Sequence, residues 1–153
     1  MEIIDLQVDF NGEIMNEKGV AIDHVGIATN DLENASKFWK MVGFMQEKDD
    51  EIVLDQGVKV RYFSTSSGVN KARIELLEPT GEDTPVGKFL SKYGPGIQQL
   101  CIRVNDIQSL LDELENAGVK LIDNKPRKGA HGARIAFIHP KSTGGVLVEL
   151  TEY

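Results

Sequence analysis

The sequence predicts an α+β domain that consists of two tandem βαβββ modules. Two observations lead to this prediction. A shift of 75 residues places residues 22–32 on residues 97–107, and it also places Gly43 on Gly118. In both copies an alternating, β-branched run is followed by an Asn-Asp pair, by apolar residues at helical spacing and by a glycine. That order is typical of a strand, a helix N-cap, a helix and the residue that ends it.

Three more strand-like runs follow the helix in each copy. They read FMQEK, GVKVRYFS and KARIELLEP in the first copy, and KLID, ARIAFIHP and GVLVELTEY in the second. Each run is rich in apolar or β-branched residues and is bounded by turn residues, which favours a strand. Between the copies, residues 84–92 lie between glycine and proline breakers, which predicts a short capped helix.

Each of the two module helices should pack through one apolar face. The positions expected to be buried are Leu32, Ala35, Phe38 and Val42 in the first helix, and Ile107, Leu110, Leu111, Leu114 and Ala117 in the second. Residues 1–19 have no counterpart in the second copy, so we interpret them as an N-terminal extension that adds at most an edge strand. We expect a single domain over residues 20–153, with modules at about 20–80 and 96–153.

Composition and charge narrow the classes of function. A chain of 153 residues can bury a core without disulfides, and its single cysteine, Cys101, cannot form an intrachain one. The formal net charge of −7, without a stripe of Lys and Arg, excludes a nucleic-acid partner. No apolar run is long enough for a membrane span, and the acidic first residues lack the features of a signal peptide. We therefore expect a cytoplasmic protein.

Four polar side chains occupy matching places in the two copies. His24 lies on the first strand of the first copy, where the second copy has Gln99. Glu75 and Glu149 lie on the last strand of each copy, each between two apolar neighbours. A buried carboxylate needs a partner. If a pseudo-two-fold axis relates the copies, the four side chains converge and offer one nitrogen and three oxygens to a divalent cation such as Zn, Ni, Co, Mn or Fe.

Each of these residues also has a plainer interpretation. A strand histidine is commonly a structural residue, and a glutamate on an antiparallel strand commonly faces water. The repeat symmetry favours the metal site over these alternatives. Weaker candidates for substrate binding are Arg103 on the face of Gln99, His131 in a glycine-rich loop, and Arg127 and Lys128 in the basic run KPRKG. For Arg103 a salt bridge, and for the other three an exposed turn, are the structural alternatives.

The chain resembles the methylmalonyl-CoA epimerases of the vicinal oxygen chelate superfamily in the runs IDHVGIAT, GIQQLCIRVNDI, EPTGEDTPVGKFLSKYGPG and RIAFIHPKSTGGVLVELTEY. The likeness spans about residues 20–153 and is most specific in HPKSTGGVLVEL. It implies a vicinal oxygen chelate fold, in which paired βαβββ modules form a U-shaped sheet around a metal ion, commonly in a homodimer. The family's ligand positions fall on His24, Glu75, Gln99 and Glu149.

Two positions depart from the epimerases. These enzymes usually carry a second histidine where this chain has Gln99, and some have a proposed glutamate base where this chain has Val60. Epimerisation removes the α-proton between a thioester and a carboxylate and returns it on the opposite face. Because valine cannot take a proton, we expect Glu75 and Glu149 to be the two bases, while the metal stabilises the enolate of the acyl-CoA substrate.

Two other activities stay open on the sequence alone. Glyoxalase I, a lyase of the same superfamily, resembles this chain in having two Glu, one His and one Gln around its metal. A metal-free small-molecule-binding protein, like the antibiotic-sequestering members of the superfamily, is the third interpretation. The C-terminal run favours the epimerase.

Overall fold

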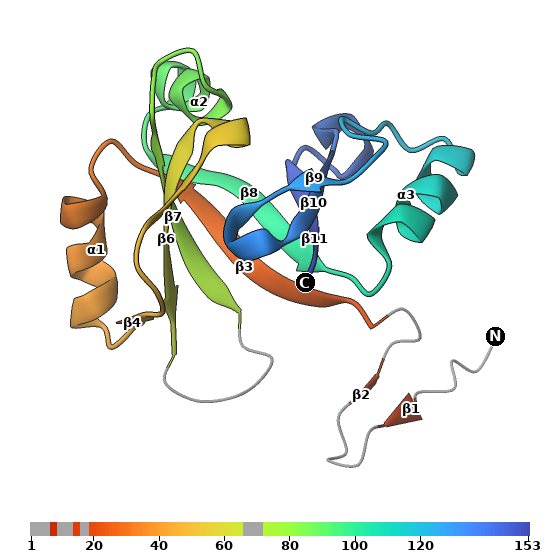
Figure 1. The fold of residues 1–153 in the computed structure, drawn as a ribbon, viewed down its shortest axis with the longest axis horizontal. Helices are drawn as coiled ribbons and strands as arrows, with labels where there is room; N and C mark the ends of the chain where they lie inside the picture. The colour runs from red at the N-terminus through yellow and green to blue at the C-terminus, as the bar shows by residue number, and fades with distance from the viewer. Residues whose placement is uncertain (1–6, 9–13, 16–18, 66–71) are drawn as a thin grey trace.

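The computed structural model describes residues 7–8, 14–15, 19–65 and 72–153 (Figure 1). The first module contains β3 (Ala21–Ala28), α1 (Leu32–Met41), β4 (Met45–Gln46), β5 (Glu51–Val53), the 3-10 turn η1 (Leu54–Gln56), β6 (Val58–Ser64) and β7 (Arg73–Pro79). The second contains β8 (Gly96–Arg103), α3 (Ile107–Asn116), β9 (Arg127–Lys128), the 3-10 turns η2 (Ala130–Gly132) and η3 (Pro140–Ser142), β10 (Arg134–Ile138) and β11 (Val148–Glu152). Helix α2 (Pro85–Tyr93) joins the modules.

One mixed sheet of nine strands runs through both modules, in the order β4-β6-β7-β3-β8-β11-β10-β9, with β5 paired to β6. The modules meet where β3 pairs antiparallel with β8. Within each module the first and last strands are parallel, β3 with β7 and β8 with β11. The four strands that carry the candidate ligands are therefore neighbours at the centre of the sheet.

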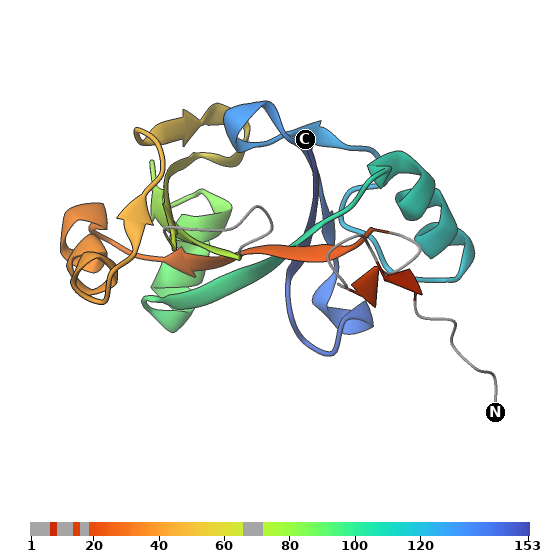
Figure 2. The same cartoon turned by 90° about the horizontal axis from the view of Figure 1, so that it is seen from below.

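The sheet curls, and α1 and α3 lie outside the curl, whereas α2 packs through Val86 against Val58 and Tyr62 on the inner face. Figure 1 shows α1 and α3 at opposite ends of the molecule. Figure 2 shows β5 of the first module and η2 of the second close together on the open side of the curl, where a hydrogen bond joins His131 to Glu51. The expected α+β architecture with a U-shaped sheet is confirmed.

The predicted helix ends are confirmed by their caps. The side chains of Asp31 and Asp106 each accept a hydrogen bond, at 2.9 Å, from the backbone N–H three residues further on. Such caps satisfy backbone donors that have no partner within the helix. Gly43 and Gly118 follow the helices with φ of 104° and 82°, a region that glycine enters without strain. Thr84 caps α2 in the same way, by accepting from the N–H of Gly87 at 3.1 Å.

The buried face of α1 differs from the predicted one. Phe38 is 60% exposed and Val42 is 54% exposed, whereas Leu32 and Ser36 are buried. The cause is Arg61, a buried residue of β6, whose Nη1 donates to Ser36 Oγ at 2.9 Å. Asp50 and Glu33 balance this buried guanidinium. The helix is therefore turned toward a polar contact that an apolar pattern does not reveal.

Smaller elements also depart from the prediction. The run KLID forms no strand, because only Leu121 pairs, in an isolated bridge to Ile138. Instead, β9 is the strand at the edge of the sheet in the second module. In the first module β5 is a short strand that the sequence did not predict. Ala117 lies exposed beyond the end of α3. In the extension, β1 (Gln7–Val8) pairs with β2 (Ile14–Met15) and not with the large sheet, and the remaining residues of 1–18 lie outside the described part.

None of the helices in the described ranges is long and apolar enough to cross a membrane.

Candidate metal centre

Two β-bulges set the directions of the candidate ligands on β3 and β8. The register of this strand pair skips Asp23 in β3 and Gln98 in β8, positions related by the repeat. A bulge re-aims the side chains beside it. Strict alternation predicts that Ile22 shares the face of His24, but Ile22 is 53% exposed while Asp23 and His24 are each 1% exposed. The bulge thus turns two consecutive polar side chains inward.

The structure brings the four predicted residues together in one buried cluster. His24 Nε2 lies 3.1 Å from Glu75 Oε2 and 3.9 Å from Glu149 Oε1. Gln99 Nε2 donates to Glu149 Oε2 at 2.9 Å, and it lies 3.4 Å from Glu75 Oε2. None of the four residues is more than 5% exposed. Gly26 gives Gln99 its space, because a Cβ there would lie 2.6 Å from Gln99 Cγ.

Tyr62 belongs to the cluster, although the sequence did not single it out. Its hydroxyl donates to Glu75 Oε1 at 2.6 Å, and its ring meets the His24 ring edge-on at 5.3 Å between centroids. Burial, followed by the charge of Glu75, raises the pKa of Tyr62 well above its ordinary value, so the hydroxyl stays protonated and donates. The only signal in the sequence was an aromatic residue in an alternating run, which is typical of any core strand.

Asp23 supports His24 from the side away from the carboxylates. Its Oδ2 lies 2.7 Å from His24 Nδ1. The same carboxylate accepts hydrogen bonds from Arg73, from Arg103 Nε at 3.2 Å and from the Tyr153 hydroxyl at 3.2 Å. Burial raises the pKa of Asp23, but the hydrogen bonds from His24 and Arg73 outweigh it and hold the pKa well below its usual range. The structure therefore pairs Arg103 with Asp23.

The two buried carboxylates share a single imidazole. Burial raises the pKa of Glu75, but the charge of His24 and the hydrogen bond from Tyr62 lower it below the usual value. Burial and repulsion from Glu75 raise the pKa of Glu149 to about 7. Burial lowers the pKa of His24, yet Glu75 and Asp23 together raise it well above its ordinary value. The cluster thus holds more negative charge than its one imidazole can balance.

This donor set fits a divalent cation. His24 Nε2 is buried and lies 3.1 Å from Glu75 Oε2, but it makes no hydrogen bond of good geometry in the part of the chain that the structure describes. A cation would take its lone pair and also offset the repulsion between Glu75 and Glu149. Imidazole, amide and carboxylate donors are common ligands of first-row divalent metals.

Asp23, His24 and Cys101 also offer ligand atoms close to one another. Asp23, however, is already bound to two guanidinium groups. Burial raises the pKa of the Cys101 thiol, so this group stays protonated and binds a metal poorly. The cluster of His24 with Glu75 and Glu149 is the better cation site.

The remaining candidates lie outside the cluster. His131 is in η2, with Nδ1 2.8 Å from Glu51 Oε2 and its ring 5.4 Å from that of Tyr62. Arg127 bonds to Asp55 at 3.1 Å, and Lys128 is exposed.

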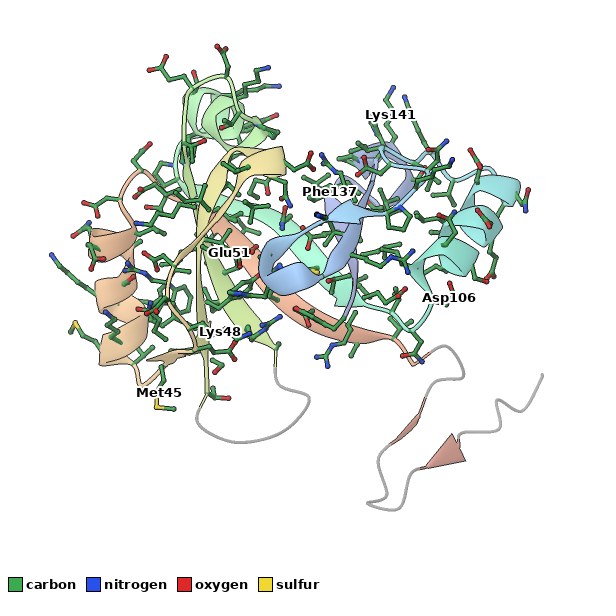
Figure 3. All side chains as sticks on the ribbon, viewed as in Figure 1. Met45, Lys48, Glu51, Asp106, Phe137 and Lys141 are labelled. Atoms are coloured by element: carbon green, nitrogen blue, oxygen red, sulfur yellow. The ribbon has the colours of Figure 1, made fainter. Side chains whose placement is uncertain are left out.

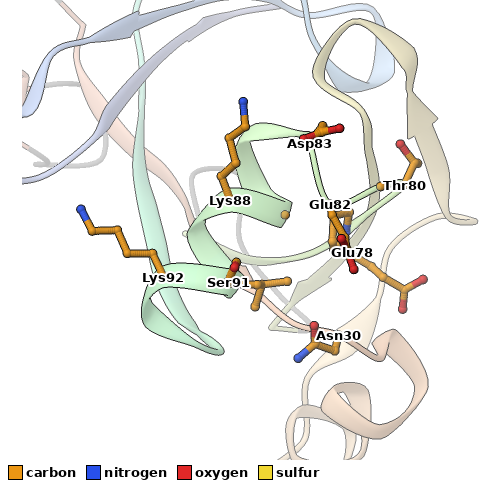
Figure 4. A pocket seen from close by; sticks show the side chains of 12 residues that line it. Asn30, Glu78, Thr80, Glu82, Asp83, Lys88, Ser91 and Lys92 are labelled. Carbon is orange, nitrogen blue, oxygen red and sulfur yellow. The ribbon is translucent and has the colours of Figure 1, made fainter.

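A mainly apolar cavity of about 150 Å³ adjoins the cluster, because Gln99 lines both. Its other walls include Val58, Leu77, Val86, Leu147, Phe137, which Figure 3 labels, and Arg127. A wider groove of about 850 Å³ lies along α2 and the loop before it, between Lys88, Lys92 and the acidic Glu78, Glu82 and Asp83 (Figure 4). None of the four clustered residues lines that groove.

Known proteins are similar to this chain in sequence and in structure. Residues 23–137 match the model of the Glyoxalase/Bleomycin resistance protein/Dioxygenase superfamily. The mitochondrial methylmalonyl-CoA epimerase of Dictyostelium discoideum is 36% identical over 92% of this chain and 84% of its own. The crystal structure of methylmalonyl-CoA epimerase from Mycobacterium tuberculosis superimposes with a TM-score of 0.80 at 40% identity, covering 88% of each chain. A methylmalonyl-CoA epimerase in complex with methylmalonyl-CoA and NH4+ superimposes with a TM-score of 0.81 at 34% identity, over 87% of this chain and 94% of the other.

Proposed function

We propose that this chain, which belongs to the Glyoxalase/Bleomycin resistance protein/Dioxygenase superfamily, is a methylmalonyl-CoA epimerase. It inverts the α-carbon of an acyl-CoA by removing a proton on one face and adding one on the other. The observation that carries the proposal is the buried convergence of His24, Glu75, Gln99 and Glu149. Relatives of that activity match nearly the whole chain, which supports the choice of substrate.

We assign His24, Glu75, Gln99 and Glu149 as the residues that hold a divalent cation, with Co, Ni, Zn or Mn as candidates. When bound, such a cation supplies Lewis-acid stabilisation of charge on the substrate oxygens. Gln99 now points its amide nitrogen at both carboxylates. Its amide must therefore turn to present Oε1 as a ligand. Asp23 keeps His24 oriented with Nε2 toward the cluster.

Glu75 and Glu149 are our candidates for proton transfer, and Glu149 is the better placed of the two. Glu75 already accepts a short hydrogen bond from Tyr62 and lies against His24. Glu149 accepts hydrogen bonds from the amide of Gln99 and the thiol of Cys101, which are weaker donors, and His24 Nε2 lies further from it, at 3.9 Å, than from Glu75. A carboxylate held by weaker donors is freer to accept and return a proton.

The apolar cavity beside Gln99 is our candidate for the part of the acyl-CoA next to the thioester. Arg127 and Lys128 in β9 are the cationic residues proposed for its anionic groups. The homodimer and the cytoplasmic location stay predictions from the sequence.

The test is exchange of the α-proton of methylmalonyl-CoA in deuterated buffer. Glu149→Gln should lower the rate of epimerisation by at least ~100-fold, since general acid–base groups contribute about 10²–10⁴-fold. Glu115→Gln, a change of an exposed glutamate on α3, is the matched control and should leave the rate unchanged. Wild-type turnover in both Glu75→Gln and Glu149→Gln would contradict the assignment.

The same purified protein can be used to distinguish the epimerase from the two other candidate functions. Conversion of the methylglyoxal–glutathione hemithioacetal without α-proton exchange would identify a glyoxalase I, an activity that the ligand set of two Glu, one His and one Gln also permits. Protein that binds no divalent cation by calorimetry, and that turns over neither substrate, would indicate a small-molecule-binding protein.

A further inference from the structure

Glu51 and His131 form a second acid–base pair, separate from the four clustered residues. His131 Nδ1 lies 2.8 Å from Glu51 Oε2. The backbone N–H of His131 donates to the same oxygen, also at 2.8 Å. One carboxylate oxygen of the first module thus fixes both the main chain and the ring of a residue in the second. Because Nδ1 is used in this contact, Nε2 is the ring nitrogen left for other chemistry.

The backbone of His131 is strained. Its φ of 55° makes it the only residue other than glycine with positive φ in the described ranges. Its loop is rich in glycine, with Gly129 and Gly132 nearby, and a glycine at position 131 would relieve the strain. Strain of this kind persists where the surrounding structure enforces it, and it is concentrated at functional sites. The imidazole is held in place at a conformational cost.

The pair faces the same interior as the metal candidates. Glu51 is the cross-strand partner of Val60, and Tyr62 lies two residues further along β6, so all three side chains share a face. The ring of Tyr62 lies 5.4 Å from the ring of His131 and 5.3 Å from the ring of His24. Tyr62 therefore contacts both His131 and the metal candidate His24. Figure 3 labels Glu51 beside the loop that carries η2.

We propose that His131, oriented by Glu51, is a catalytic acid–base residue on one face of the substrate α-carbon, and that Glu149 serves the opposite face. This assignment rests on the proposed function. A histidine whose Nδ1 is bound to a carboxylate has a fixed ring orientation and a defined reacting nitrogen. His131 is 17% exposed, so it can meet a substrate and then exchange its proton with solvent. Glu75 then remains a ligand that Tyr62 holds.

The protons and electrons of the proposed epimerisation balance without any further reactant. The α-C–H bond breaks, its proton moves to His131 Nε2, and its electron pair enters the enolate of the thioester. Solvent then supplies a proton to the other face, on the side of Glu149, and a new C–H bond forms from that electron pair. His131 has gained one proton and the solvent has lost one. Release of the His131 proton to solvent, or the reverse reaction, resets the site.

The test follows each epimer separately in deuterated buffer with His131→Asn. Asparagine tolerates positive φ, so this variant removes the imidazole and keeps the backbone. We expect epimerisation to fall by at least ~100-fold while KM changes less than about threefold. One epimer alone should still exchange its α-proton, because only the Glu149 face stays active. Glu51→Gln should lower kcat by ~10-fold or more with the same asymmetry, and it serves as the second variant if His131→Asn does not fold.

His139→Asn is the matched control, since the ring of His139 accepts a hydrogen bond from the N–H of Lys141 at η3, outside the cluster. Epimerisation within about threefold of wild type in His131→Asn, or equal loss of exchange by both epimers, overturns the assignment to His131 and leaves the proposed function standing. If instead the unmodified protein exchanges the α-proton of neither epimer, the proposed function fails, and the role of His131 fails with it.

Discussion

The two modules use the same bulge in different ways. Asp23 in β3 and Gln98 in β8 are the extra residues of equivalent bulges, and each precedes a candidate ligand. Asp23 has four partners, namely His24, Arg73, Arg103 and Tyr153. Gln98 buries its Oε1 without a hydrogen-bond partner in the part of the chain that the structure describes. Both modules therefore have the bulge in their backbone, but only in the first module does the bulged residue carry a charged side chain with several polar partners.

This difference explains how a symmetric fold builds an asymmetric site. A second carboxylate at position 98 would add negative charge near a region that already buries Glu75 and Glu149. Asp23 is tolerated because two arginines neutralise it. The first module thus holds an oriented imidazole, whereas the second supplies Gln99, whose amide can turn. We infer that His24 fixes the geometry of the centre and that Gln99 adapts to it.

The largest expected effect comes from removing the charge that supports His24. In Asp23→Asn the partly buried guanidinium of Arg73 loses one of its two carboxylate partners and keeps Glu47, while His24 Nδ1 loses its carboxylate. Removing one partner from a buried pair costs about 3–5 kcal/mol, and both arginines beside Asp23 are partly exposed, so we expect a loss of about 3 kcal/mol, at the lower end of that range, in the free energy of unfolding. Cation affinity should fall by about 10–100-fold. Urea unfolding and calorimetric titration with Zn or Co measure the two effects.

Asp49→Asn is the matched control, because Asp49 is exposed. It should change neither quantity appreciably. Cation affinity in Asp23→Asn within twofold of wild type would show that the support of His24 is structural and has no bearing on the metal.

A second prediction concerns the pH dependence of stability and compares Glu75 with Glu149, the buried carboxylates of the two modules. The pKa of Glu149 is raised to about 7, against an ordinary value of 4.5, whereas the pKa of Glu75 is lowered. A group whose pKa is raised by folding stabilises the protein below its unfolded pKa and loses that contribution as the pH rises through the folded pKa. Without a bound cation, the protein should therefore lose on the order of 2 kcal/mol between pH 4.5 and 7.5 through Glu149.

Thermal unfolding across this pH range, in wild type and Glu149→Gln, isolates the contribution. The variant should gain stability relative to wild type as the pH rises, since its amide carries no charge. A saturating divalent cation should remove the loss in wild type, because the cation offsets the charge. If the stability of wild type and of Glu149→Gln changes with pH in the same way in the absence of metal, the raised pKa of Glu149 is contradicted.

Much of this site could be predicted from the sequence because it lies on a repeat. The shift of 75 residues relates His24 to Gln99, and the alternation around Glu75 and Glu149 places each glutamate among apolar neighbours. Once β3 pairs with β8, the repeat places the four strands that carry these residues next to one another in the sheet. The helix caps at Asp31 and Asp106 were equally visible, because capping depends on neighbouring residues alone.

The parts that the sequence did not reveal depend on contacts between distant residues. A bulge is a mismatch between two strands, so neither strand alone shows that Asp23 turns inward beside His24. Arg61 buries Ser36 through a contact with α1 that no apolar period predicts. His131 looks like an ordinary loop residue until Glu51, 80 positions away, is seen to hold it. Local patterns predict elements, but they do not predict which polar residues meet.

The smallest expected effect comes from the bulge in the second module. In Gln98→Leu an apolar side chain of similar size replaces a buried acceptor that has no partner in the described residues. Leaving a buried polar atom unpaired costs about 1–3 kcal/mol, so its removal should leave stability unchanged or raise it by up to ~1 kcal/mol. Cation affinity should stay within about twofold of wild type, in contrast to Asp23→Asn. Urea unfolding and titration under identical conditions compare the two bulges, and a loss of affinity as large as that of Asp23→Asn would show that both bulges support the metal alike.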